Sequence, residues 1–496
     1  MKKALIVLAI LALPTLTFGQ GRNNTWLLGN DPGWPNVGRI IFDSSSYQLL
    51  TEQRKMPFKG TQATISDDQG NFLMSSNGVW IANAINDTMM NGSGLNPSYL
   101  TNSYPNGIPL DNGNIIIPFP GDSSKYVLFH MSIWGQFSIS LKAVYKSVID
   151  ISLDGGLGAV IQKNDTIISD TLSWGITACK HGNGRDWWVV FVRDGNPEIY
   201  KMLITPNGVE NITTQSFGLM ANTFGNVSQL VFSQDGTKFI YCSPSNQMQN
   251  GNVYLADFDR CTGMFSNIQF IPVSSLGYLY GLAFSPSGEF IYACTSGYVF
   301  QINSTTLSID TIATYDGFIS GFPPNCCATS FWSMYLAANG KVYITSGSSV
   351  QHLHEMNYPD SAGVSCDVQQ HTIALGNYFH LRAVPNHPNY YLGPLTGSPC
   401  DTLTNLYELT EHDFRFSVSP NPNNGEFKIM YLLPQNQKGK LEVFDVNGRK
   451  VYEMNLPKWS TMQVVSLPES VTSGVYNCVI SSADKRVNKK IAVLKE

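Results

Sequence analysis

The sequence is poor in charge and in long helical or apolar segments. Only 14% of its 496 residues are charged, while 43% are hydrophobic. The chain is therefore globular and large enough for more than one domain. No long stretch repeats with the 3.6-residue period of an amphipathic helix, which argues against an all-helical fold. Residues 20–413 carry 17 basic and 29 acidic side chains, which argues against nucleic acid as a partner.

One apolar run stands out, and it lies at the N-terminus. Lys2 and Lys3 precede the apolar residues 4–13, and small residues follow. This pattern predicts a secretory signal peptide over residues 1–19, with cleavage after Gly19. The run is too short to span a bilayer, so we expect no integral membrane segment after cleavage.

Familiar catalytic motifs are also missing. The sequence contains no G-x-S-x-G, H-E-x-x-H or P-loop pattern. His352 and His354 share one strand face, but a third metal ligand is not evident nearby. Asp67 precedes a glycine turn and could suggest calcium, but Asp, Asn and Gly are ordinary residues at such a turn. We therefore predict no catalytic residue, metal or cofactor. A polysaccharide hydrolase or lyase remains an alternative, because sequence spacing cannot pair carboxylates across a fold.

The nine cysteines are an odd number for an exported chain, so at least one thiol stays free. Cys242 and Cys294 occupy equivalent strand positions, where buried free cysteines are common. Cys366 and Cys400 flank the end of the repeated region in loop-like sequence. They are the best candidates for a disulfide.

A short pattern recurs along the chain: an apolar strand, a glycine turn, then a strand of alternating aromatic or β-branched residues. It is clearest at residues 231–243, 283–296 and 336–346. The turn glycines are spaced 51, 63, 52, 52 and 52 residues apart, at Gly70, Gly121, Gly184, Gly236, Gly288 and Gly340. A period near fifty residues with several strands per unit is typical of a β-propeller.

Partial repeats flank these six units. Residues 24–50 supply strand-like pieces but no full repeat, and residues 380–393 resemble an isolated strand pair. Strands from both ends would complete a last blade and remove the free sheet edge. The sequence thus predicts an all-β protein with a seven-bladed β-propeller over residues 20–397, followed by a linker at 398–413.

Residues 414–496 form a different module. They read as six or seven alternating strands, and Asn447-Gly448 is a strong hairpin signal. Antiparallel strands at this density predict a small immunoglobulin-like β-sandwich.

This module resembles the C-terminal sorting domain of the Bacteroidetes type IX secretion system. The resemblance covers about residues 416–496 and rests on the order of its motifs, through Pro420, Asn421, Pro422, Gly425, Asn447, Gly448, Gly474, Lys489 and Lys490. It implies the type IX secretion machinery as a partner. It also implies periplasmic transit of a WD-repeat-like propeller cargo, which is then secreted or held on the outer-membrane surface.

Aromatic residues recur where the innermost strands begin. Trp174, Tyr278, Tyr280 and Trp332 lie eight or ten residues before turn glycines, hence near one mouth of a central channel. Such side chains could form a stacking platform for a sugar or a peptide, or they could pack between blades. The sequence favours a binding module over an enzyme. A purely structural surface component is the third alternative.

Overall fold

The computed structural model describes residues 21–30, 36–134, 140–195, 198–217, 229–244, 250–274, 278–320, 326–382, 384–401, 415–432, 438–456, 462–482 and 485–495. The predicted signal peptide lies outside them. The chain divides into two compact units, Met1–Cys400 and Asp401–Glu496. Each is described by itself.

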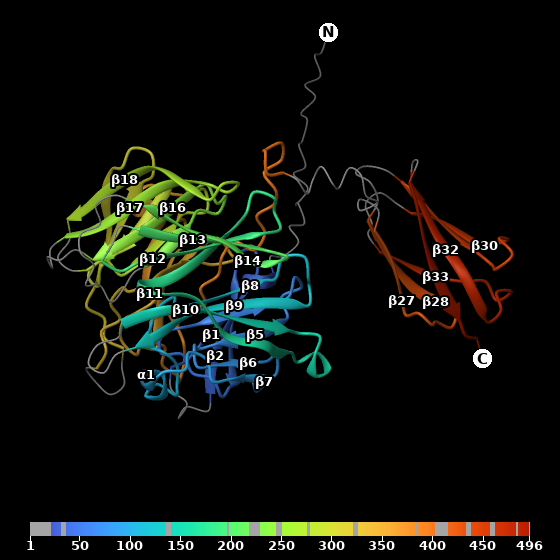
Figure 1. The fold of residues 1–496 in the computed structure, drawn as a ribbon, viewed down its shortest axis with the longest axis horizontal. Coiled ribbons are helices and arrows are strands. Elements are labelled where there is room, and N and C mark those ends of the chain that lie inside the picture. The colour runs from blue at the N-terminus through green and yellow to red at the C-terminus, as the bar shows by residue number, and fades with distance from the viewer. Residues whose placement is uncertain are drawn as a thin grey trace, which may run out of the picture. The chain divides into compact units, whose positions relative to one another are not determined.

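The first unit is built of antiparallel strands that follow one another in sequence order (Figure 1). The first groups, up to the start of a long strand, are β1 (Thr25–Leu28), β2 (Asn36–Phe42), β3 (Tyr47–Gln53); β4 (Ala63–Ser66), β5 (Phe72–Ser76), β6 (Trp80–Ala82), β7 (Thr88–Ser93); and β8 (Asn114–Pro118), β9 (Lys125–Trp134), β10 (Ser140–Asp150). The long strand β11 (Ala159–Lys180) pairs through its first half with β10 and through its second half with β12. Its first residue, Ala159, also pairs in parallel with Met90 of β7, so β4–β14 lie in one sheet.

The remaining groups of the first unit repeat this order. They are β12 (Trp187–Arg193), β13 (Glu198–Thr205), β14 (Gly208–Ser216); β15 (Leu230–Phe232), β16 (Lys238–Pro244), β17 (Asn250–Asp259), β18 (Met264–Ser274); β19 (Gly281–Phe284), β20 (Phe290–Cys294), β21 (Tyr298–Asn303), β22 (Ile309–Thr314); and β23 (Met334–Leu336), β24 (Val342–Ile344), β25 (His352–Met356), β26 (Val368–Ala374). The helices are short: α1 (Tyr99–Asn102), η1 (Gly21–Asn23), η2 (Asp154–Gly156) and η3 (Gly363–Cys366). Across the described ranges, no helix has the length and apolar character needed to cross a membrane.

The six predicted turn glycines all join the first strand of a group to its second strand. Their φ angles are positive, at 89°, 79°, 74°, 70°, 74° and 77° in sequence order. A side chain is unfavourable at such angles because its Cβ collides with the backbone, which explains the recurrence of glycine. The predicted hairpin period is confirmed.

The first strands of successive groups lie side by side. Their contacts run in the order β1, β4, β8, β11, β15, β19 and β23. The two ends of the series meet, because the Trp26 ring in β1 lies 6.2 Å from the Tyr335 ring in β23, edge to face. Within the described residues, we call this nearly closed series of first strands the strand ring.

The strand pair predicted for residues 380–393 is not formed. In the described part of this segment, the one ladder contact is an isolated bridge between Val350 and His380. Strands β1–β3 make a three-stranded sheet without it. Pro385 and Pro388 remove amide donors that a ladder needs, so the segment is a poor strand former.

The predicted Cys366–Cys400 disulfide is wrong. Cys400 bonds Cys261, in the turn between β17 and β18, across a sequence separation of 139. Cys366 is free and buried, as are Cys242 and Cys294, for which the prediction is confirmed. Cys366 lies in a hydrophobic core beneath Tyr292 and Met356, so its thiol is not available to a loop at the chain's end.

The second unit consists of two antiparallel sheets. One contains β27 (Arg415–Ser419), β28 (Glu426–Leu432) and β31 (Met462–Ser466), and the other contains β29 (Gly439–Phe444), β30 (Lys450–Leu456), β32 (Gly474–Ser482) and β33 (Lys485–Val493). Side chains from both sheets, such as Ile429 and Leu441, share one core. The predicted hairpin at Asn447-Gly448 joins β29 to β30, with Gly448 at a φ of 78°.

Candidate ligand site at one mouth of the strand ring

The aromatic residues Tyr280 and Trp332 are in contact at one end of the strand ring, the mouth at which the first strands start. They precede β19 and β23, which are neighbours in the ring. Their rings stack with centroids 3.9 Å apart and planes 16° from parallel. Any side chain at Gly347 would collide with the indole, since a Cβ there would lie 2.4 Å from it. The Trp332 ring therefore packs closely against the backbone at Gly347.

The Trp332 indole also reaches across the mouth. Its Nε1 donates a 2.8 Å hydrogen bond to Oδ2 of Asp111, which precedes β8. The Asp111 side chain is almost fully buried, at 1% exposure, and its Oδ1 has no hydrogen-bond partner among the described residues. Burial raises the pKa of this carboxyl, while Arg382 and the indole N–H oppose the rise. Within the described residues, the buried Asp111 carboxyl group thus accepts one hydrogen bond, from the Trp332 indole N–H.

Arg382 completes this cluster. Its guanidinium carbon lies 5.1 Å from the centroid of the Trp332 ring, within the range of a cation–π contact. Its backbone N–H donates to Ser346 O at 2.9 Å, and its φ of 62° is unusual for a residue with a side chain. Sequence reasoning missed Arg382 and Asp111 because neither belongs to the aromatic pattern.

Of the other two predicted aromatic residues, one lies beside the stack. Tyr278 is half-buried and close enough to Tyr280 to raise its pKa, although burial of Tyr280 is the larger cause. Trp174 is only 7% exposed and belongs to the hydrophobic core around β8–β13. The structure therefore brings together Tyr278, Tyr280 and Trp332, and places Trp174 in the core.

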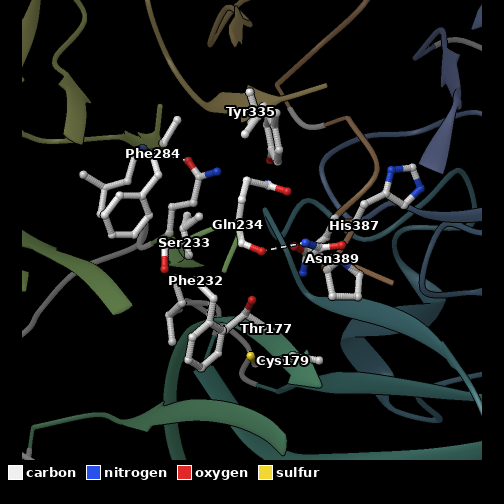
Figure 2. A pocket seen from close by; sticks show the side chains of 18 of the residues that line it. Thr177, Cys179, Phe232, Ser233, Gln234, Phe284, Tyr335, His387 and Asn389 are labelled. Atoms are coloured by element: carbon white, nitrogen blue, oxygen red, sulfur yellow. Dashed lines mark hydrogen bonds between the residues drawn. The ribbon is translucent and has the colours of Figure 1, made fainter. Parts of the chain in front are cut away.

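The interior of the ring is filled by the chain itself, in the segment Pro385–Leu392. Asn386 Nδ2 donates to Ile176 O at 2.6 Å, and His387 Nε2 lies 2.7 Å from Thr64 O. Figure 2 shows the next contact, in which Asn389 Nδ2 donates to Gln234 O at 2.7 Å. These bonds reach the backbone of three groups, so residues 385–392 form an axial segment.

The space left beside the axial segment is small. A cavity of about 70 Å³ lies between it and strands that include β15 and β19. Drug-sized ligands occupy sites of about 300–1,000 Å³, so this cavity suits a few water molecules instead. A larger ligand of the first unit would not fit here. Another hollow of that unit, of about 440 Å³, is lined by residues that include Phe119, Lys125 and Pro206.

The axial segment leaves through the opposite mouth, beside the glycine turns. Arg260 Nη2 donates to Gly393 O at 2.6 Å, and Leu395 N donates to Gly182 O at 2.7 Å. The Cys261–Cys400 disulfide then holds the end of the unit to the same turn as Arg260. The chain therefore passes along the ring axis and is fastened where it emerges.

The other sequence candidates have structural roles. Oδ1 of Asp67 accepts from the backbone N–H groups of Gln69 and Asn71 within its own turn. His354 is buried, and its Nδ1 accepts from the backbone N–H of His371. No group of three or more His, Cys, Asp or Glu side chains in the described ranges is placed to hold a metal ion.

Comparison with known proteins identifies the C-terminal unit. Residues 417–494 match the secretion system C-terminal sorting domain, Por_Secre_tail. This match supports export by type IX secretion. The sorting domain implies interaction with the secretion machinery and delivery outside the cell or to its surface.

Two motifs of the sorting domain that are distant in sequence are hydrogen-bonded to each other. Asn421 Nδ2 donates to Lys490 O at 3.1 Å, and Ala492 N donates to Asn421 Oδ1 at 2.8 Å. The Ser419–Pro422 motif is thereby bonded to the last strand, β33. Lys489 and Lys490 are exposed on that strand.

Solved structures resemble the chain only distantly, and no curated protein matches it. A functionally unknown protein from Desulfotomaculum acetoxidans has 11% identity and a TM-score of 0.38, over 73% of this chain and 99% of that one. A hypothetical selenium-binding protein from Sulfolobus tokodaii has 9% and 0.38, over 74% and 96%. The oligogalacturonate lyase of Vibrio parahaemolyticus has 9% and 0.33, over 66% and 89%. At these scores the likeness carries no argument about function.

Proposed function

We propose that the first unit is a seven-bladed β-propeller that binds a ligand at the mouth formed by Tyr280, Trp332, Arg382 and Asp111. The supporting observation is the contact between these four side chains above a ring whose interior is filled. Each strand group would be one blade, and the strand ring would be the set of innermost strands. The protein would then act as a secreted or surface-displayed binding module.

The chemistry of the mouth suits a ligand with both an apolar face and polar groups. Tyr278 and Tyr280 offer partly exposed aromatic rings, and Arg382 offers a cation next to them. Ring faces of this kind stack on sugars or on aromatic groups of peptides, while the charged group fixes orientation.

Tyr280→Ala tests the proposed function. With the full exported chain screened on a glycan and peptide array, we expect binding of the best ligand to weaken by about 1–3 kcal/mol, as for a stacked aromatic anchor. Tyr358→Ala is the matched control, because Tyr358 is 62% exposed and lies after β25, away from the mouth. Equal binding by both variants would contradict the site. A ligand that is released chemically altered would favour the hydrolase or lyase alternative.

Removal of residues 414–496 tests the export assignment. Because the sorting domain carries the signal for the secretion machinery, the shortened chain should accumulate in the periplasm. Cell fractionation with an antibody against the first unit measures this. Normal delivery of the shortened chain to the surface would show that another part of the sequence directs export.

A further inference from the structure

Arg382 differs from the other arginines of the first unit because, within the described residues, its side chain forms no hydrogen bond or ion pair. Arg22 pairs with Asp68, Arg39 and Arg54 pair with Glu52, and Arg193 pairs with Asp170. Across the described residues, the Arg382 Nε is buried without a hydrogen-bond partner. The guanidinium contacts the Trp332 ring, and its charge partly offsets the rise that burial causes in the pKa of the nearby Asp111 carboxyl.

The guanidinium is nevertheless held in place. Its backbone is fixed at a φ of 62° by the hydrogen bond to Ser346 O. Trp332, on which it rests, is in turn fixed by Tyr280 and by Asp111. An arginine held in one position with its donors unused has already lost much of the freedom that binding would cost. Planar guanidinium donors match the two oxygens of a carboxylate.

We propose that Arg382 binds a carboxylate of the ligand, and that this ligand is a saccharide carrying the carboxylate on its sugar ring. The proposal rests on the ligand site described under the proposed function. Tyr280, next to Arg382, would take the apolar face of the same sugar.

The ring backbone favours a saccharide over a peptide. Peptides that bind through their main chain need free backbone groups at a strand edge. On the axis side of the ring, the carbonyls of Ile176, Thr64 and Gln234 are already bonded to side chains of the axial segment. At the proposed mouth, Tyr280 offers side-chain stacking and Arg382 offers one charged contact, and these suit a sugar acid.

The net negative charge of the first unit limits how a negatively charged ligand can bind. Residues 20–413 carry 12 more acidic than basic side chains, so long-range attraction cannot draw a polyanion to this unit. Binding should therefore depend on one carboxylate at Arg382, with weak dependence on salt.

The test uses the full exported chain and two oligosaccharides that differ only in the end sugar, glucuronate or glucose. Calorimetry should show tighter binding of the glucuronate form to the unchanged protein. Arg382→Ala should weaken that binding about tenfold to a hundredfold, the range of a charge-assisted hydrogen-bond pair, and leave the glucose form unchanged. Arg382→Lys should keep part of the preference for glucuronate over glucose, because lysine retains the positive charge but lacks the two parallel donors of the guanidinium.

Two controls accompany this test. Arg449→Ala, on an exposed turn of the sorting domain, should bind like the unchanged protein, and melting curves should show that the Arg382 variants are folded. Equal affinity for both sugars, or equal weakening of both by Arg382→Ala, would overturn the carboxylate proposal. The ligand site itself would still be supported if Tyr280→Ala lost binding. Binding of a peptide with a free C-terminal carboxylate, with no binding of either sugar, would also overturn it.

Discussion

Replacing Trp332 with alanine should destabilise the first unit by about 3 kcal/mol, the lower end of the range for buried aromatic residues, because Trp332 is half-buried. The change removes the stack with Tyr280 and the packing against Gly347. It also removes the donor to the buried Asp111 carboxyl, and a buried acceptor left without a donor adds to the loss. Chemical denaturation of the purified chain measures the change.

The effect of losing the indole donor should grow as pH rises. Burial holds the pKa of Asp111 above its usual value, so the stability it contributes is present at low pH and declines as pH rises through the folded-state pKa. Without the indole N–H, the carboxylate form loses a stabilising bond and that pKa rises further. Where Asp111 stays buried, as in Trp332→Phe, stability should therefore fall more steeply with pH than in the unchanged protein.

Trp332→Phe is the matched comparison. It keeps a ring for Tyr280 and removes only the indole donor, so we expect a loss of about 1–3 kcal/mol with the same steeper pH dependence. A loss below about 1 kcal/mol for alanine, with no change in the pH profile of Trp332→Phe, would show that the Trp332 contacts contribute little to the fold.

The second large effect is expected for Cys400→Ser, which opens the disulfide to Cys261. Closing a loop of 139 residues restricts the unfolded chain strongly, and the loop-entropy relation gives about 4–5 kcal/mol for such a length. The Arg260 bond to Gly393 remains in this variant, so the axial segment should stay inside the folded ring. Thermal unfolding with and without a dithiol reductant measures the contribution.

Cys366→Ala distinguishes the two pairings. Cys366 is free in the structure, so this variant should keep the full response to reductant. Cys400→Ser should lose most of that response, because the remaining Cys326–Cys327 disulfide closes no loop of useful length. A lost response in Cys366→Ala would restore the pairing that the sequence suggested.

The sequence alone determined the local features of this protein. Gly70, Gly236 and Gly340 were recognisable because a tight turn requires a positive φ at one residue, and glycine recurs wherever the turn recurs. The sorting domain was recognisable from the order of its motifs, among them the turn glycine Gly448, whose φ is positive for the same reason. The aromatics Tyr280 and Trp332 followed from their fixed distance to the turn glycines.

Only the tertiary structure decided which residues far apart in sequence lie together in the strand ring. Asp111 and Trp332 are 221 residues apart, and Cys261 and Cys400 are 139 apart, so no local spacing relates them. Residues 380–393 read as a strand pair, yet they bond along the axis because the ring offers inward carbonyls that Asn386 and His387 satisfy. Buried polar groups must find partners, and those partners exist only once all the first strands stand side by side.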